Sequence, residues 1–230
     1  MYTKKLLTIG FNLIIFILGI IGCAMEINVG GWRIIRFYTF DSNLIGTIAS
    51  GIMFLFLLAA FIHESDTIPK WIIMLKYIAT CLLSVTFLVV VFVLAPMSAS
   101  HYNSLGKALA ALLFGNAMVY QHFLCPVISI ITALFFDPPL NPSEKLINKK
   151  PTAGIAAFIA VIFTTIYAIV TIILNAIGLL DGPYPFLKVR EQPIWMSCLW
   201  VIIILGLAYF IAWILAKFGT LLKPETNKDT

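Results

Sequence analysis

The sequence predicts an all-α polytopic membrane protein, and its composition and its long apolar runs carry that prediction. Of the 230 residues, 61% are hydrophobic and only 11% are charged, whereas a soluble globular domain carries about 25% charged residues. Six apolar runs are each long enough to cross a hydrocarbon core of about 30 Å as a helix. These runs cover residues 6–25, 41–62, 72–96, 108–136, 154–180 and 194–216. We therefore expect one domain, 1–230, of six transmembrane helices with short connections.

Turn-forming and aromatic residues support these boundaries in chain order. Gly30-Gly31 precedes the second run, Asp137-Pro138-Pro139 follows the fourth, and Gly182-Pro183-Tyr184-Pro185 precedes the sixth. Glycine and proline at such points favour a reversal of the chain. Tryptophans near the predicted span ends are typical of the aromatic belt at the headgroups, and they are Trp32, Trp71, Trp195 and Trp213.

Basic residues between the runs predict the orientation. Ten lysines fall on the side of the two termini: Lys4, Lys5, Lys70, Lys76, Lys145, Lys149, Lys150, Lys217, Lys223 and Lys228. Five basic residues fall on the other side: Arg33, Arg36, Lys107, Lys188 and Arg190. By the positive-inside rule, this excess puts both termini in the cytoplasm. Because the positive charge is scattered over short loops, we expect no nucleic-acid partner.

Ionisable side chains are nearly absent from the predicted spans. Glu26, Asp41 and Lys76 lie at span edges, and His122 is the one deeply placed ionisable residue. An ionisable residue inside a membrane indicates a functional site, although a neutral histidine hydrogen-bonded between helices remains the structural alternative. The four cysteines fall in four different runs without ligand spacing, so we expect no metal and no cofactor.

Two features surround His122 in the fourth run. Pro126 has no N–H for the carbonyl four residues back, which predicts a freed His122 carbonyl and a kink beside the imidazole. Gly115, His122 and Ser129 recur at seven-residue spacing. This spacing predicts two small residues on the face of the histidine, which would let neighbouring helices come close.

The start of the second run carries a polar face. Thr39, Asn43, Gly46 and Ser50 step by four, three and four residues, which predicts that this face of the helix looks into the bundle. A second interpretation remains open here. Thr39 is a good N-cap residue, and Asp41 in the first turn would face the positive end of the helix dipole, so capping alone would explain both.

Three motifs in this order resemble those of a known family. They are Arg36-Phe37-Tyr38-Thr39-Phe40-Asp41, His122 followed by Pro126, and Tyr184-Pro185-Phe186-Leu187. Over nearly its whole length the chain resembles the androgen-induced-gene family of membrane proteins and its bacterial six-span relatives. The resemblance implies a transmembrane threonine hydrolase that cleaves fatty acid esters of hydroxy fatty acids, with Thr39 as the nucleophile and His122 as the base. The Ser42-Asn43 pair is similar to the bacterial branch, which implies a bacterial cell membrane.

This pairing is chemically sound. A threonine hydroxyl is a weak nucleophile that needs an adjacent base, and a neutral imidazole supplies one near neutral pH. We expect the substrate to be a membrane lipid or other acyl ester that reaches the site from the bilayer. Asn116 or Tyr120 could orient His122, and Asn43 could donate to an oxyanion. The candidates for the substrate pocket or the oxyanion donor are Asp41, Ser42, Asn43, Asn116, Tyr120 and Tyr184.

Depth is the difficulty for this pairing. Thr39 lies near the outer end of its span, whereas His122 is 15 residues after Lys107, about 22 Å along an ideal helix. The two residues meet only if the loop 96–107 rises above the bilayer or the second helix is sunk, and we expect a cavity that opens to the outer side. The alternatives are a small-solute transporter or channel gated by His122, with a path open to both faces, and a scaffold without chemistry.

Overall fold

The computed structural model of the chain describes residues 2–65, 67–140 and 153–222, and within these ranges it is helical without strands. The elements are α1 (Tyr2–Gly30), the 3₁₀ segment η1 (Gly31–Arg36), α2 (Tyr38–Ile62), α3 (Lys70–Val89), the π segment η2 (Val90–Leu94), α4 (Ala95–Ser98), α5 (Leu105–Phe114), the π segment η3 (Val119–Leu124), α6 (Cys125–Phe135), α7 (Ala153–Ala176), the 3₁₀ segment η4 (Pro185–Leu187) and α8 (Ile194–Leu221). Their length and apolarity identify an all-α polytopic membrane protein, as the composition predicts.

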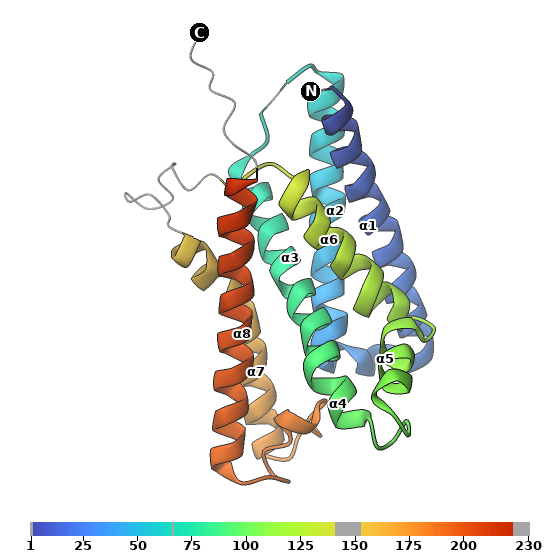
Figure 1. Cartoon of the computed structure of the whole chain (residues 1–230), viewed down its shortest axis with the longest axis vertical. Coiled ribbons are helices and arrows are strands. Elements are labelled where there is room, and N and C mark those ends of the chain that lie inside the picture. The colour runs from blue at the N-terminus through green and yellow to red at the C-terminus, as the bar shows by residue number, and fades with distance from the viewer. Residues whose placement is uncertain (1, 66, 141–152, 223–230) are drawn as a thin grey trace.

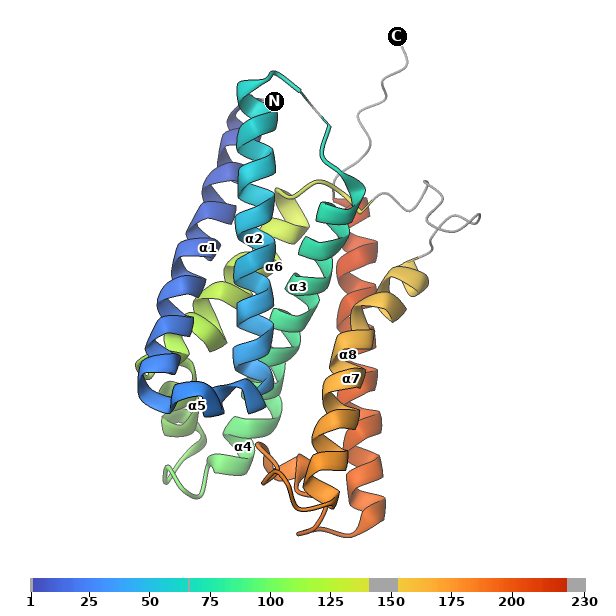
Figure 2. The same ribbon diagram turned by 180° about the vertical axis from the view of Figure 1, so that it is seen from behind.

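Five continuous helical stretches in the described ranges can cross a membrane, and they cover Tyr2–Arg36, Tyr38–Ile62, Lys70–Ser98, Ala153–Ala176 and Ile194–Gly219. The bent pair of Leu105–Phe114 and Val119–Phe135 makes up to six crossings. Helix α1 begins and α8 ends at one end of the bundle, which we call the terminal end (Figure 1). The segments η1, α4, α5 and η4 gather at the opposite end, which we call the distal end (Figure 2).

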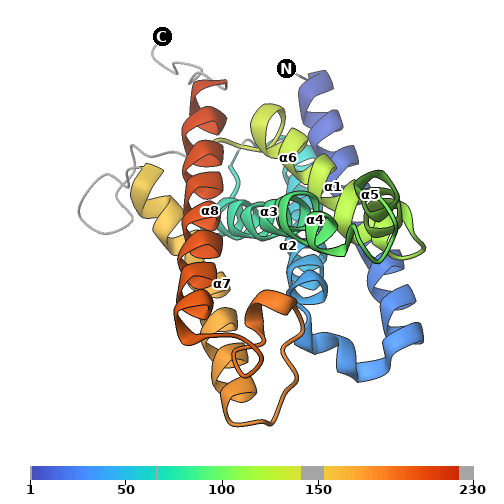
Figure 3. The ribbon, with the colours of Figure 1, turned by 60° about the horizontal axis from the view of Figure 1, so that its bottom comes forward.

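Helix α3 is the centre of the bundle. It contacts α2 and α6 on one side and α7 and α8 on the other, and this central position is clear along the bundle in Figure 3. Small residues line its contact with the α7–α8 pair, among them the fully buried Ala157 and Ala212. The Tyr77 hydroxyl crosses this contact and donates to the Ala212 carbonyl at 2.7 Å. Close backbone approach over small residues is the usual means of packing helices in a membrane.

The fourth predicted span is not one straight helix. Helix α5 ends at Phe114, and the chain bends by 95° before η3 and α6 continue the crossing. Asn116 in the bend has a φ of 43°, a left-handed conformation that asparagine tolerates better than most residues. Gly115 therefore belongs to a different helix from His122 and Ser129, and the prediction of a shared face at seven-residue spacing is wrong.

Lys76, in the second turn of α3, is buried between helices, so His122 is not the one ionisable group that the bundle buries. The Lys76 side chain is only 3% exposed and donates from Nζ to Ser50 Oγ on α2 at 2.8 Å. The Asp137 carboxylate, itself buried just after α6, attracts the ammonium group, and Asn12 Nδ2 on α1 donates to Asp137 Oδ1 at 2.9 Å. Lys76 lies near the start of α3 in sequence, but α2 and the end of α6 cover that turn.

The orientation stays a prediction. Among the basic residues of the described ranges, Lys4, Lys5, Lys70 and Lys217 belong to the terminal end. Lys76 is left out of the count of basic residues on that side because it is buried. The remaining lysines of that side, Lys145, Lys149, Lys150, Lys223 and Lys228, lie outside the described residues. If both termini are cytoplasmic, the distal end faces the outside.

Close packing of α1 against α2 can be tested at two glycines of α1. A Cβ at Gly19 would collide with the Thr47 side chain, whereas a Cβ at Gly10 would meet nothing within 4 Å. We expect Gly10→Ala to raise the thermal midpoint of the detergent-solubilised protein, because alanine is favoured over glycine inside a helix by roughly 0.5–1 kcal/mol. Gly19→Ala should lower the midpoint. A Gly19→Ala protein as stable as Gly10→Ala would contradict the close approach of the two helices.

Candidate active site

Thr39 is the second residue of α2 and does not cap it. The N-cap is Phe37, which makes no side-chain capping bond, so the capping interpretation of Thr39 is wrong. Two tyrosine hydroxyls instead accept hydrogen bonds from free N–H groups of the first turn. Tyr38 N–H donates to the Tyr167 hydroxyl at 3.1 Å, and Thr39 N–H donates to the Tyr184 hydroxyl at 3.2 Å. The Thr39 side chain is thereby free for other contacts.

The end of α5 supplies the partner that orients His122. The last four carbonyls of a helix lack donors within it, and the Leu112 carbonyl is one of them because α5 ends at Phe114. His122 Nδ1 lies 2.6 Å from that carbonyl oxygen. Since a carbonyl oxygen can only accept, Nδ1 carries the proton of this bond. The predicted orienting residues do not fill this role, because a backbone carbonyl does.

The other imidazole nitrogen faces the threonine. His122 Nε2 lies 3.3 Å from Thr39 Oγ1, across 83 positions of the sequence. With Nδ1 protonated, the neutral ring offers the Nε2 lone pair to the Thr39 hydroxyl, which donates to it. His122 is 5% exposed and Thr39 is half-buried. A hydroxyl, a nitrogen base and an orienting acceptor thus stand in the order that an activated nucleophile requires.

The bend between α5 and η3 removes the difficulty of depth. The distance of about 22 Å from Lys107 assumed one unbroken helix, whereas α5 turns by 95° before the segment that carries His122. His122 is therefore the fourth residue of η3 and lies near the distal end, where α2 begins. Segments of π-helix are frequent at functional sites.

Tyr184 completes the group of polar side chains around Thr39. Its hydroxyl lies 3.2 Å from Thr39 Oγ1 and accepts from the Thr39 N–H, so the phenolic hydrogen can point to Thr39 or to a ligand. The Tyr184 ring stacks on Phe186 at 5.3 Å between centroids and meets the edge of Phe37. Burial raises the pKa of Tyr184 above its ordinary value, which keeps the phenol protonated at neutral pH.

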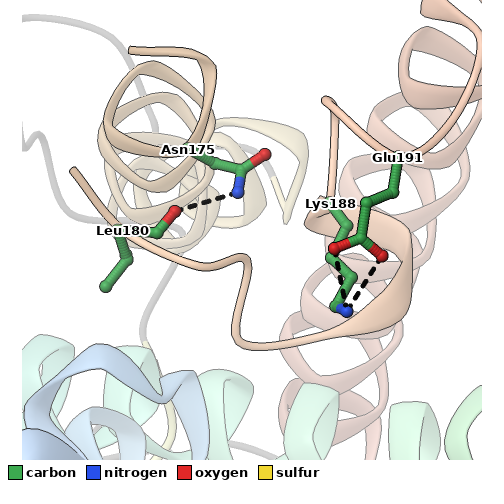
Figure 4. A network of polar contacts seen from close by, with 4 residues as sticks. All are labelled: Asn175, Leu180, Lys188 and Glu191. Carbon is green, nitrogen blue, oxygen red and sulfur yellow. Dashed lines mark hydrogen bonds and ion pairs between the residues drawn. The ribbon is translucent and has the colours of Figure 1, made fainter. Parts of the chain in front are cut away.

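The loop between α7 and α8 carries Tyr184, and polar contacts shape both of its ends. Asn175 Nδ2 at the end of α7 donates to the Leu180 carbonyl at 2.9 Å (Figure 4). Lys188 and Glu191 form an ion pair at 3.0 Å before α8 begins. The ion pair is exposed and contributes little stability, and the loop contacts the start of α2 through the bonds of the Tyr184 hydroxyl with Thr39.

A cavity reaches Thr39 from the side of α7 and α8. Counted out into the open space at its mouth, it holds about 590 Å³ of empty space. Thr39 and Tyr184 are among the residues that line it, and nearly all of the wall is apolar, as at Val89, Leu94 and Ile204. His122 does not line this cavity and reaches Thr39 from η3. The cavity is therefore an apolar space that reaches the residue whose hydroxyl meets the imidazole.

The other predicted site residues have different surroundings. Ser42 Oγ donates to the Thr39 carbonyl and bonds to Thr86 Oγ1 at 2.8 Å, with no base beside it. Asn43 uses its amide nitrogen on two backbone carbonyls, so it has no N–H aimed at the cavity. Asp41 is half-buried in the first turn of α2, Asn116 is exposed in the bend, and Tyr120 packs near Gly22. Among the named candidates, Tyr184 is the one whose side chain bonds to the Thr39 hydroxyl.

Sequence reasoning missed two contributors to this site. The Leu112 carbonyl carried no side-chain signal, although Gly115 three residues later could have marked the end of a helix. Tyr167 of α7 donates to the Arg36 carbonyl at 2.7 Å and accepts from Tyr38 N–H. Its pairing depends on how α7 packs against α2, which no local pattern predicts.

Comparison with known proteins leaves the function to be argued from this geometry. A scan against protein-family models, a search of curated proteins and a search of solved structures each returned no match to the chain. The function is therefore inferred from the chemistry of the residues around Thr39.

The tautomer of His122 can be measured directly. We expect ¹⁵N NMR of histidine-labelled protein to show Nδ1 protonated and Nε2 unprotonated in the neutral ring, because the Leu112 carbonyl accepts from Nδ1. The exposed His63 and His101 serve as internal references, and His122→Gln assigns the signal. A neutral His122 with its proton on Nε2 would contradict the geometry.

Proposed function

We propose that the chain is an intramembrane carboxylic ester hydrolase in which Thr39 is the nucleophile and His122 is the general base. The observation that carries the proposal is the 3.3 Å contact of Thr39 Oγ1 with His122 Nε2, on a ring whose Nδ1 is bound to the Leu112 carbonyl. That carbonyl has two of the roles of the aspartate in a serine-hydrolase triad, because it selects the tautomer of the imidazole and fixes the orientation of the ring.

The reaction proceeds in two halves. Thr39 Oγ1 attacks the ester carbonyl carbon while His122 Nε2 takes the hydroxyl proton, and the tetrahedral adduct collapses as Nε2 returns the proton to the leaving alcohol. A water molecule then attacks the acyl-threonine and gives one proton to Nε2. Collapse of this second adduct returns that proton to Thr39 and releases the carboxylic acid. The ester and one water thus become an alcohol and an acid.

The cavity supports an acyl ester as the substrate. Its apolar wall along η2 and α8 fits a hydrocarbon chain, and Thr39 and Tyr184 are among the residues that line it. A fatty acid ester of a hydroxy fatty acid, the substrate that the family resemblance implies, has this form. Because Tyr184 accepts from the Thr39 N–H, its own O–H is the donor available to the oxyanion.

The arrangement of cavities favours hydrolysis over transport. A second cavity of about 410 Å³, including its open space, lies beside Lys76 and Asp137, and it shares no lining residue with the cavity at Thr39. A transporter needs one passage reachable from both faces, whereas these cavities are separate.

Loss of either member of the pair should abolish turnover. We expect Thr39→Ala and His122→Ala each to lower kcat on a fatty acid ester of a hydroxy fatty acid by a factor of at least about 10³, as for paired catalytic groups elsewhere. A fluorophosphonate probe should label the parent and fail to label Thr39→Ala.

Thr132→Ala is the matched control for this experiment. Thr132 is a buried threonine at the far end of α6 that donates to the Ser129 carbonyl, so the same chemical change there should leave kcat unchanged. Full activity or persistent labelling in folded Thr39→Ala would reject the nucleophile assignment.

Tyr184→Phe tests the oxyanion donor. Removing only the phenolic oxygen should lower kcat by about 10²-fold, the usual effect of losing one oxyanion donor, and should change KM little. The ring contacts with Phe37 and Phe186 are kept in this variant. Since the hydroxyl also accepts from the Thr39 N–H, the thermal midpoint is measured in parallel. An unchanged kcat would exclude Tyr184 from the reaction.

A further inference from the structure

The π segment η3 leaves one buried backbone carbonyl without a donor in its own helix. Cys125 N–H, which would bond to Gln121 in an α-helix, instead donates to the Tyr120 carbonyl five residues back. In the same five-residue register the next donor, to the Gln121 carbonyl, would be Pro126, which has no N–H. The Gln121 side chain is 2% exposed and Pro126 is fully buried. Water cannot easily satisfy this carbonyl, so it needs a protein donor.

Asn43 supplies that donor. Its Nδ2 lies 3.0 Å from the Gln121 carbonyl and 2.9 Å from the Thr39 carbonyl. Both partners are carbonyl oxygens, which only accept, so the nitrogen of the amide must face them. The side chain is 1% exposed, and a buried hydrogen bond of this kind is costly to lose.

The two bonds of Asn43 join the two halves of the site. One ends on the carbonyl of Thr39 itself, and the other ends on the carbonyl of the residue immediately before His122. From the opposite side, Gly22 of α1 lets η3 come close, because a Cβ there would meet Tyr120 Cβ at 2.9 Å and Gln121 Cγ at 3.3 Å. Residues 120–122 are therefore held between α1 and the amide of Asn43.

We infer that Asn43 is a positioning residue that sets the distance between the Thr39 hydroxyl and the His122 imidazole by tying the backbone of α2 to the backbone of η3. The inference rests on the proposed function. Asn43 does not line the cavity and has no N–H aimed at a substrate. Its effect on the reaction passes through the geometry of Thr39 and His122 alone.

A matched pair of asparagines provides the test. Asn12 on α1 has the same pattern, with Nδ2 donating to the carbonyl four residues back and to Asp137 Oδ1, but its partners lie at the terminal end. Asn43→Leu should lower kcat and the rate of fluorophosphonate labelling about 10- to 100-fold with KM unchanged, since a misplacement of about 1 Å costs that much. Asn12→Leu should keep kcat per folded molecule within about twofold of the parent.

A double variant separates positioning from simple burial of a carbonyl. In Asn43→Leu with Pro126→Ala, the new N–H can satisfy the Gln121 carbonyl from within the helix, so the protein should fold and regain its thermal midpoint. The tie to Thr39 is still missing, and kcat should stay low. This variant carries the test even if Asn43→Leu alone does not fold.

The outcomes distinguish a failure of this inference from a failure of the proposed function on which it rests. Parental kcat in the folded double variant would overturn the positioning role, because satisfaction of the carbonyl would then be all that Asn43 provides. A kcat in Asn12→Leu as low as in Asn43→Leu would overturn it as well. Thr39→Ala is measured in the same assay, and activity retained there would reject the hydrolase proposal itself.

Discussion

The hydrogen bond between His122 Nδ1 and the Leu112 carbonyl is the interaction on which the site depends. It exists because α5 stops at Phe114 and the chain bends before η3 begins. In an apolar interior a carbonyl at a helix end must find a donor. The imidazole provides one, and in doing so it keeps its other nitrogen unprotonated toward Thr39. This one bond satisfies the Leu112 carbonyl and leaves Nε2 able to accept from the Thr39 hydroxyl.

The same rule explains the rest of the site. Around the site, regular α-helix is interrupted at the start of α2, at the end of α5 and in η3, and each interruption leaves backbone groups that a neighbouring element satisfies. At the start of α2 the N–H groups of Tyr38 and Thr39 meet two tyrosine hydroxyls, and in η3 the Gln121 carbonyl meets Asn43. Irregular backbone at membrane depth is tolerated only where protein surrounds it. The start of α2, the end of α5 and η3 therefore lie together, and Thr39 and His122 lie with them.

Parts of this arrangement could be read from sequence, and parts could not. The spacing of Asn43, Gly46 and Ser50 indicates an inward face of α2, and all three are buried. Thr39 and His122 were paired through a family resemblance, since a residue pair 83 positions apart leaves no periodic signal. The break at Gly115 was read as a small-residue position because apolar residues continue on both sides of it. The burial of Lys76 is not predictable from its place near a span edge, because burial depends on which helices cover a turn and not on the distance of that turn from a helix end.

What the sequence by itself determined is the solvent and the class of structure: too few charges for water, and apolar runs of a length that only membrane helices explain. It also determined which side chains could do chemistry, because so few polar groups lie in those runs. Only the tertiary structure decided the 95° bend, the acceptor for Nδ1 and the cavity beside Thr39. Each of these depends on contacts between segments far apart in the chain. Local sequence patterns do not predict which distant groups will satisfy a buried donor or acceptor.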